Sequence, residues 1–176
     1  MNNMKKLFAL LIALALGCLF ALAEPAPETE ETAMPAFFTL EGKIAEIGED
    51  GSLTLECADL GAVLVLTDAD TVWETMGDIA PGAYVHVDYD GKMTRSLPPQ
   101  VTAQRVRMYV LSGDVLEYNA EENTVLIDTP SHGQVQVNLA EPLPEGAHAQ
   151  LTVYFDGAMT MSLPPQIGAD LILADE

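Results

Sequence analysis

The sequence predicts an all-β protein made of two copies of one unit, and two observations carry this prediction. Apolar and polar residues alternate along most of the chain beyond residue 37, which is the period of β-strands. Residues 90–103, DGKMTRSLPPQVTA, recur as residues 156–169, DGAMTMSLPPQIGA, with ten of fourteen positions identical. Weaker matches on both sides extend each copy to about 65 to 70 residues, the size of a small domain.

In the first copy, the alternation predicts five strands, at residues 38–47, 52–57, 62–68, 83–90 and 100–110. Between the third and fourth strands, Thr71 and Glu74 have the spacing of a helix capping box, which predicts a short helix there. Gly77 and Pro81 limit this helix to about two turns. Trp73, the only tryptophan, is expected to pack as a core or cap residue beneath the insertion.

In the second copy, strands are predicted at residues 109–118, 123–129, 133–140, 147–155 and 165–174. Residues 141–146 are too short and too rich in proline to form a helix. Five strands with an insertion after the third is the order of a small OB-type barrel. The sequence therefore predicts two tandem OB-like five-stranded β-barrels, residues 37–109 and 110–176, joined through residues 108–111 without a flexible linker.

The repeated motif also carries a resemblance. Residues 89–100, YDGKMTRSLPPQ, resemble a signature of exported, functionally uncharacterised repeat proteins of Gram-positive anaerobes. The strand order is similar to that of bacterial periplasmic OB-fold proteins, a likeness of topology alone. The first likeness covers twelve residues in each copy, and neither family brings a catalytic residue to this chain. The resemblance implies an exported binding or structural module.

The first 36 residues differ in composition from the rest. Lys5 and Lys6 precede an uncharged apolar run, residues 7–23, which ends in small residues and predicts a secretory signal peptide cleaved after Ala23. Residues 24–36, EPAPETEETAMPA, predict an acidic, extended tether. Two alternatives stay open: a transmembrane anchor of near-minimal length, and lipidation at Cys18, which follows glycine near the end of the run. The expected location is the cell envelope or the extracellular space.

Charge and cysteine content exclude several classes of protein. The chain has 27 acidic and 7 basic side chains, a formal net charge of −20, and without residues 1–23 the charge becomes −22 over 153 residues. Carboxylates repel phosphate backbones, so we expect no nucleic-acid partner. Two cysteines make neither a disulfide scaffold nor a four-cysteine zinc site. Cys57 is expected to serve as a small apolar residue at a strand end.

The sequence predicts no enzyme, no cofactor and no metal site, because it contains no nucleophile elbow, His-Glu-x-x-His or phosphate-loop motif. The histidines have no metal-ligand spacing and are expected at the surface or in turns. They are His86, His132 and His148. A calcium-binding module is a distant alternative, since three acids come close together in sequence without the spacing of an EF-hand loop. These acids are Asp68, Asp70 and Glu74.

Candidate ligand-binding residues lie in the repeated loops, because the loop between the fourth and fifth strands lines the usual ligand surface of an OB-type barrel. In one interpretation the loops present polar groups to a ligand. In the other, Leu97 and Leu163 plug the barrel ends while the prolines stiffen the crossover. The polar candidates are Thr94, Ser96 and Gln100 in the first copy and Thr160, Ser162 and Gln166 in the second.

The basic residues are concentrated in the first copy. Lys92, Arg95, Arg105 and Arg107 lie between residues 92 and 107, and the second copy has apolar residues at the four matching positions, Ala158, Met161, Leu171 and Leu173. Arg105 and Arg107 share one strand face because they are two residues apart. The patch either forms ion pairs with neighbouring acids or binds an anionic partner, such as a carboxylate-bearing glycan or an acidic peptide. In the second case, replacing both arginines with glutamine should abolish binding and leave thermal stability nearly intact.

The expected function is therefore that of a non-catalytic exported module. It would contact a peptide, a glycan or another envelope protein through the repeated loops or an exposed sheet edge. The alternative is a structural or stress-related envelope protein without a specific ligand, whose acidic barrels act as spacers. Contact with a membrane is expected only through the leader segment or a lipid on Cys18. The oligomeric state stays open.

Overall fold

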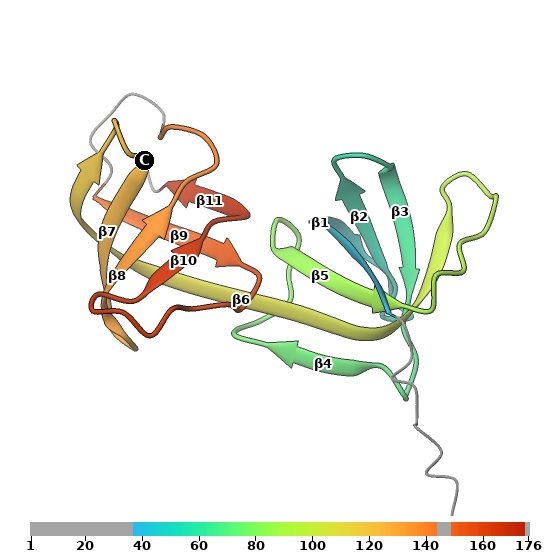
Figure 1. Cartoon of the computed structure of the whole chain (residues 1–176). Helices are drawn as coiled ribbons and strands as arrows, with labels where there is room; N and C mark the ends of the chain where they lie inside the picture. The colour runs from blue at the N-terminus through green and yellow to red at the C-terminus, as the bar shows by residue number, and fades with distance from the viewer. Residues whose placement is uncertain (1–36, 144–148, 175–176) are drawn as a thin grey trace, which may run out of the picture. The chain divides into compact units, whose positions relative to one another are not determined.

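The computed structural model describes residues 37–143 and 149–174, and within these ranges the protein is all-β with no helix. The strands are drawn in Figure 1. Their bounds are β1 Phe38–Ile47, β2 Leu53–Cys57, β3 Gly61–Leu66, β4 Val72–Thr75, β5 Tyr84–Tyr89, β6 Gln100–Asn119, β7 Thr124–Thr129, β8 Gly133–Asn138, β9 Gln150–Phe155, β10 Gln166–Gly168 and β11 Leu171–Ala174. The all-β prediction is confirmed.

Strand pairing divides these elements into two groups that share β6. We call β1–β5 with residues 100–108 the first lobe, and residues 109–119 with β7–β11 the second lobe. In the first lobe β1 pairs with β2, β2 with β3, β3 with β6, β6 with β5, and β5 again with β1. All these pairs are antiparallel except β3 with β6, which is parallel.

The second lobe repeats this order. Strand β6 pairs with β7, β7 with β8, β8 with β10 in parallel, and β9 with both β6 and β11. The single strand predicted over 165–174 is divided at Ala169 and Asp170, whose amides donate to Asn138 on one side and Tyr154 on the other. The last strand thus contacts β8 with its first half and β9 with its second.

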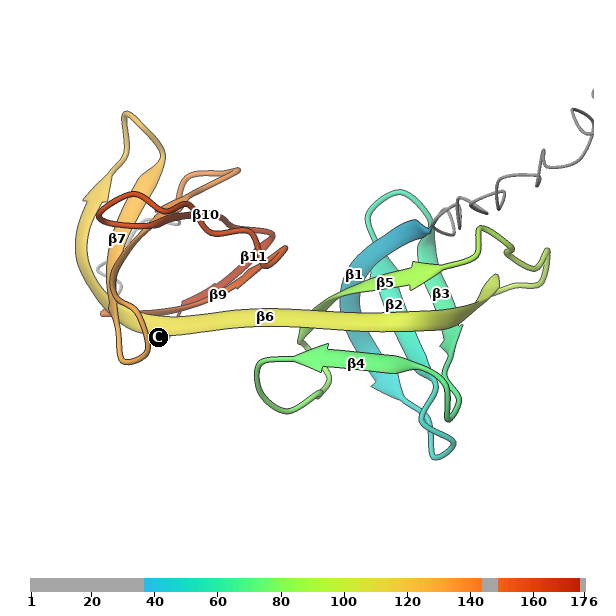
Figure 2. The same ribbon diagram turned by 60° about the horizontal axis from the view of Figure 1, so that its bottom comes forward.

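Strand β6 is 20 residues long and serves both lobes (Figure 2). Val106, Met108 and Val110 pack in the first apolar core, whereas Tyr109 and Leu111 pack in the second. Successive side chains of a strand point to opposite faces, so from Met108 to Leu111 the even positions serve the first core and the odd positions the second. The fifth strand of the first copy and the first strand of the second are therefore one element that buries both of its faces.

The predicted helix near residue 71 is wrong, because residues 72–75 form β4, parallel to residues 105–108 of β6. Thr71 does cap a local structure, but it is a turn: its Oγ1 accepts from the Asp68 amide at 3.0 Å and donates to the Ala103 carbonyl at 3.1 Å. Strand β6 leaves β3 after Thr102, which frees the edge that β4 takes. Trp73 is 42% exposed there and is not a core residue.

The expected signal peptide (1–23), the acidic tether (24–36) and the lipidation candidate Cys18 lie outside the described residues. Over the residues that are described, no helix of sufficient length and apolarity to cross a bilayer occurs.

Cys57 yields a prediction on reactivity. It is a buried free thiol at the end of β2, as expected, and the loss of solvation raises the pKa of this thiol to about 11. A thiol that keeps its proton is a poor nucleophile. In a chain starting at Glu24, which lacks Cys18, Ellman's reagent should leave the native protein unlabelled at neutral pH and label one thiol in concentrated guanidinium chloride. Rapid labelling of the native protein would contradict the buried placement.

Candidate functional site

The repeated motif forms a loop of the same construction in each lobe, and these loops are the candidate functional site. The first loop, residues 90–99, connects β5 to β6, and the second loop, residues 156–165, connects β9 to β10. Both begin with an Asp-Gly turn and both contain a cis peptide bond between leucine and the first proline.

An aromatic ring lies against the glycine of each turn. Gly91 has φ +82° and packs against Phe38, while Gly157 has φ +92° and packs against Tyr109. A Cβ atom on Gly157 would lie 2.5 Å from the Tyr109 ring, and one on Gly91 would lie 2.6 Å from the Phe38 ring. The turn of each motif requires glycine because the backbone there is left-handed and because the aromatic ring leaves no room for a Cβ atom.

The aspartate of each turn accepts a backbone hydrogen bond that closes the turn. Asp90 Oδ1 accepts from the Lys92 amide at 2.9 Å, and Asp156 Oδ1 accepts from the Ala158 amide at 2.8 Å. In the first loop the Lys92 ammonium also donates to Asp90, and this hydrogen bond lowers the pKa of the Asp90 carboxyl from its ordinary value.

Hydrogen bonds of a threonine and a serine hydroxyl hold the rest of each loop together. In the second loop Thr160 Oγ1 accepts from the Gln166 amide at 2.8 Å and lies 2.7 Å from Ser162 Oγ, which donates to the Pro164 carbonyl at 2.7 Å. The first loop has the same three contacts at the same distances. Because each serine donates to a carbonyl, the threonine hydroxyl must donate to the serine. These hydroxyls are engaged within the loop, which explains their repetition without a ligand.

The loop leucines, Leu97 and Leu163, lie apart from these hydrogen-bonded hydroxyls. Leu97 and Leu163 are each 97% exposed, and Met161 beside Leu163 is fully exposed. The interpretation that these leucines plug the barrel ends is therefore wrong. Two prolines follow each leucine and fix the backbone at φ near −65°, so the loop holds the leucine at its tip and directs it into solvent.

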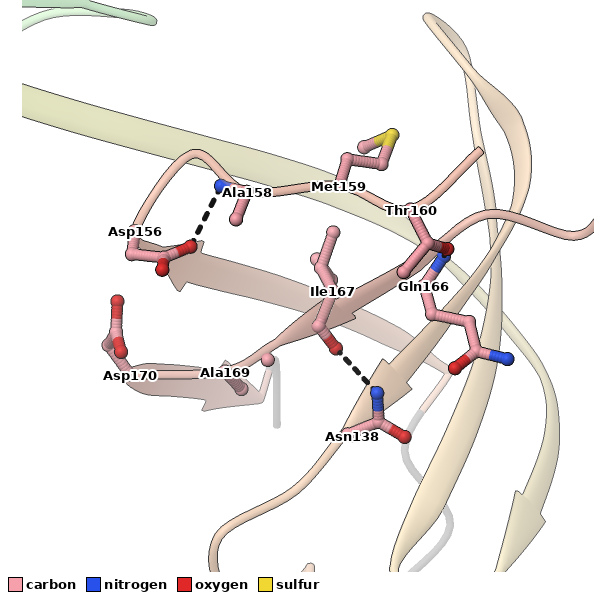
Figure 3. A pocket seen from close by; sticks show the side chains of 10 residues that line it. Asn138, Asp156, Ala158, Met159, Thr160, Gln166, Ile167, Ala169 and Asp170 are labelled. Carbon is pink, nitrogen blue, oxygen red and sulfur yellow. Dashed lines mark hydrogen bonds between the residues drawn. The ribbon is translucent and has the colours of Figure 1, made fainter. Parts of the chain in front are cut away.

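A hollow lies at the base of each loop, and Figure 3 shows the one in the second lobe. Its volume is about 390 Å³, against about 270 Å³ for the first. Met159 and Ile167 are apolar residues of its lining, and Gln166 is one of the polar residues that line it. Gln100 lines the smaller hollow of the first lobe in the same way, beside Lys92. The lysine occupies the position where the second copy has Ala158.

The basic patch is largely neutralised. Arg107 Nη2 donates to Asp88 Oδ1 at 2.7 Å, and Arg105 Nε lies 3.5 Å from Glu74 Oε1. Together with the pair between Lys92 and Asp90, three of the four basic residues have carboxylate partners in their own lobe. Among residues 37–143 and 149–174, Arg95 forms no ion pair, and it is exposed two residues before Leu97.

His86 corrects the expectation that the histidines lie at the surface or in turns. It is only 5% exposed, with Nε2 at 3.1 Å from Asp170 Oδ2 and Nδ1 at 3.6 Å from Glu41 Oε2. Burial raises the pKa of the Asp170 carboxyl, and the attraction of the imidazole opposes that shift. His86 thus holds a polar contact between β5 and the segment that precedes β11.

The acids considered for calcium do not converge. Asp68 Oδ1 accepts from the amides of Asp70 and Thr71, and Glu74 pairs with Arg105. Within the described part of the chain, no group of three acidic, histidine or cysteine side chains is placed to hold a metal ion.

The repetition in the sequence identifies both loops, but one of its two interpretations placed Leu97 and Leu163 in the barrel ends. A signal for the tips was present: the leucine precedes two prolines and follows hydroxyl residues, so it lies outside any alternating strand pattern. The exposed edge of β4 was missed because the same residues matched a capping box.

Arg107 supports a prediction that replaces the expectation of nearly intact stability. Its partner Asp88 is 7% exposed, and among the described residues the one other side chain that donates to its carboxylate is the Thr39 hydroxyl, at 2.8 Å. R107Q should lower the free energy of unfolding by about 1–3 kcal/mol, because it leaves a buried carboxylate short of a donor. R105Q, at a half-exposed pair, should change it by less than about 0.5 kcal/mol. Urea unfolding followed by circular dichroism measures both, and equal effects would contradict a structural role for Arg107.

The turn glycines support a second prediction. G157A should lower the free energy of unfolding by about 1–2 kcal/mol for the left-handed backbone and by about 1–3 kcal/mol more for overlap with Tyr109. The matched control is G133A in the same lobe, where φ is +66° and nothing lies within 4 Å of the added Cβ. Thermal and urea unfolding compare the two variants. If both lose the same stability, the contact between ring and glycine is unimportant.

The comparisons with known proteins found no relative of this chain. No protein-family model matches the chain, and neither the curated proteins nor the solved structures yielded a match.

Proposed function

We propose that the chain is a non-catalytic binding module of the cell envelope or extracellular space, which engages its partner through the leucine tips of its two repeated loops. One observation carries this proposal: Leu97 and Leu163 are each 97% exposed at the tip of a loop whose threonine and serine hydroxyls are satisfied within the loop. Export is the expectation from residues 1–23.

Physical chemistry favours such tips as anchors. Burying a leucine side chain stabilises a complex by roughly 1.5–3 kcal/mol. A preorganised loop loses little conformational freedom on binding, so more of this free energy contributes to affinity. A single exposed leucine is ordinary in any protein. A binding role is supported because the leucine is exposed in both copies, on loops held by the same hydrogen bonds.

The two tips differ in the chemistry they offer. The second presents Met161 and Leu163, an entirely apolar pair, and both side chains are fully exposed. The first presents Leu97 with the unpaired Arg95 close by in the loop. We propose that both accept an apolar pocket of a partner protein or peptide, and that the first also favours an anionic group beside that pocket. Of the four basic residues, we assign the contact with an anionic group to Arg95, because the other three pair with carboxylates of their own lobe.

We also propose that each lobe is a small OB-like barrel. The support is the pairing order, in which the first, second, third, fifth and fourth strands of a lobe follow one another and the third and fifth are parallel. In such barrels the loop between the fourth and fifth strands lies at the ligand surface. This is the position of both repeated loops.

The tips yield a test. In L97S/L163S the saturable binding of the purified protein to an envelope extract should fall at least tenfold, because both apolar anchors are removed. The matched control is L60S/L116S, which replaces two leucines that are about half exposed elsewhere on the surface. Biolayer interferometry over a dilution series measures binding, and thermal unfolding should be nearly unchanged in both double variants.

Two results would contradict the proposal. Equal loss of binding in the control variant would mean that general surface hydrophobicity, and not the tips, is responsible. Complete absence of saturable binding in the wild-type chain would favour the alternative of a structural or stress-related envelope protein that acts as an acidic spacer.

A further inference from the structure

Strand β4 has a free edge. It pairs with residues 105–108 of β6, and no other described strand pairs with it. The opposite edge of the same β6 residues is covered by β5. Figures 1 and 2 both show β4 beside β6. The second copy has no counterpart of this strand among its described residues.

The backbone groups that face this edge can be identified. In a parallel pair, alternate residues of a strand bond to a given neighbour. The Met76 amide donates to the Met108 carbonyl at 2.7 Å, so Val72, Glu74 and Met76 direct their amides toward β6. The amide and carbonyl groups of Trp73 and Thr75 consequently face away from β6. They offer donors and acceptors to an added strand.

The side chains along the edge are apolar and exposed. Val72 is 48% exposed, Trp73 42% and Met76 37%. Edge strands are normally protected by charge or proline. The one charged residue in β4, Glu74, is turned to Arg105 and to the Tyr109 hydroxyl, which lies 3.4 Å from its carboxylate. A hollow of about 320 Å³ beside the strand, lined by Phe37, Val72, Asp88, Gln104 and Arg105, offers room for a side chain.

The charges around the free edge of β4 indicate what kind of partner segment would bind there. Exposed aspartates stand on both sides of β4, Asp68 and Asp70 before it and Asp78 after it. The chain as a whole carries a net charge of −20. A second copy of this chain would bring the same acids to the contact and be repelled. An extended segment with basic residues around an apolar centre would be attracted.

We propose that β4 is a docking strand for an extended, basic segment of a partner protein, which adds to the sheet along the free edge. Main-chain hydrogen bonds to Trp73 and Thr75 provide affinity, and the apolar side chains and the flanking aspartates provide specificity. This site is separate from the loop tips. A protein can use one of the two sites without the other.

Trp73 supplies the readout, because it is the only tryptophan of the chain and lies on the docking strand. The probe is a labelled nonapeptide of alternating valine and threonine with two lysines at each end. Binding should shift the Trp73 emission to shorter wavelength and raise the anisotropy of the label to saturation. Glutamate in place of the lysines should weaken binding at least tenfold, and so should a proline at the centre of the peptide.

Variants of β4 test the backbone mechanism. T75P removes an amide that faces outward and keeps the bonds of Val72, Glu74 and Met76 to β6, so it should weaken binding at least tenfold. T75V keeps the amide and should bind as the wild type does. V72K provides a second test that does not depend on proline, because its charge repels the lysines of the probe. Circular dichroism checks the fold of each variant, and L97S/L163S should bind the probe normally.

Three results would overturn the proposal. The first is no saturable change with the basic peptide up to millimolar concentration. The second is equal binding of the basic and glutamate peptides, or equal binding by T75P, V72K and the wild type. The third is concentration-dependent self-association in sedimentation experiments that V72K abolishes, which would make a second copy the occupant.

Discussion

The sharing of β6 is the constraint on which the rest of the structure depends. One strand completes the first lobe and begins the second, so both of its faces must be apolar where the lobes meet. The run Met108 to Leu111 meets this requirement: Met108 and Val110 serve one core while Tyr109 and Leu111 serve the other. A shift of one residue in register would place each set in the wrong core. The two copies are therefore linked by side-chain alternation as well as by covalent continuity.

The same constraint extends to the loops. Tyr109, at the start of the second copy, packs against Gly157 and lies 5.9 Å from Phe155 between ring centroids. Phe38 repeats this arrangement with Gly91 and Tyr89, at 6.1 Å. Each copy thus holds its repeated loop by a ring on its own first strand. The loop is part of the packed unit, and its tip is an extension of that unit into solvent.

The sites differ in how far the sequence could predict them. The repeated loops were found because duplication preserves their internal hydrogen bonds, which depend on residues close together in the chain. The carboxylate partners of Arg105, Arg107 and His86 come from segments 19 to 84 residues away in sequence, and no local pattern identifies them. The capping-box spacing at Thr71 gave the wrong element for the same reason. Its hydroxyl does bond locally, but the edge of β6 supplies a continuous set of backbone partners to residues 72–75.

Residue order by itself determined the strand class, the duplication and the position of the Asp-Gly turns, because alternation and turn chemistry act over a few neighbouring residues. The positions of nearly all strands follow from it. Only the tertiary structure decided which side chains are exposed. Leu97 and Leu163 are apolar yet exposed to solvent because no segment of the described chain packs over the loop tips, and His86 is polar yet buried, with Glu41 and Asp170 beside it. Exposure depends on what other segments bring to a residue, and that is a property of the whole fold.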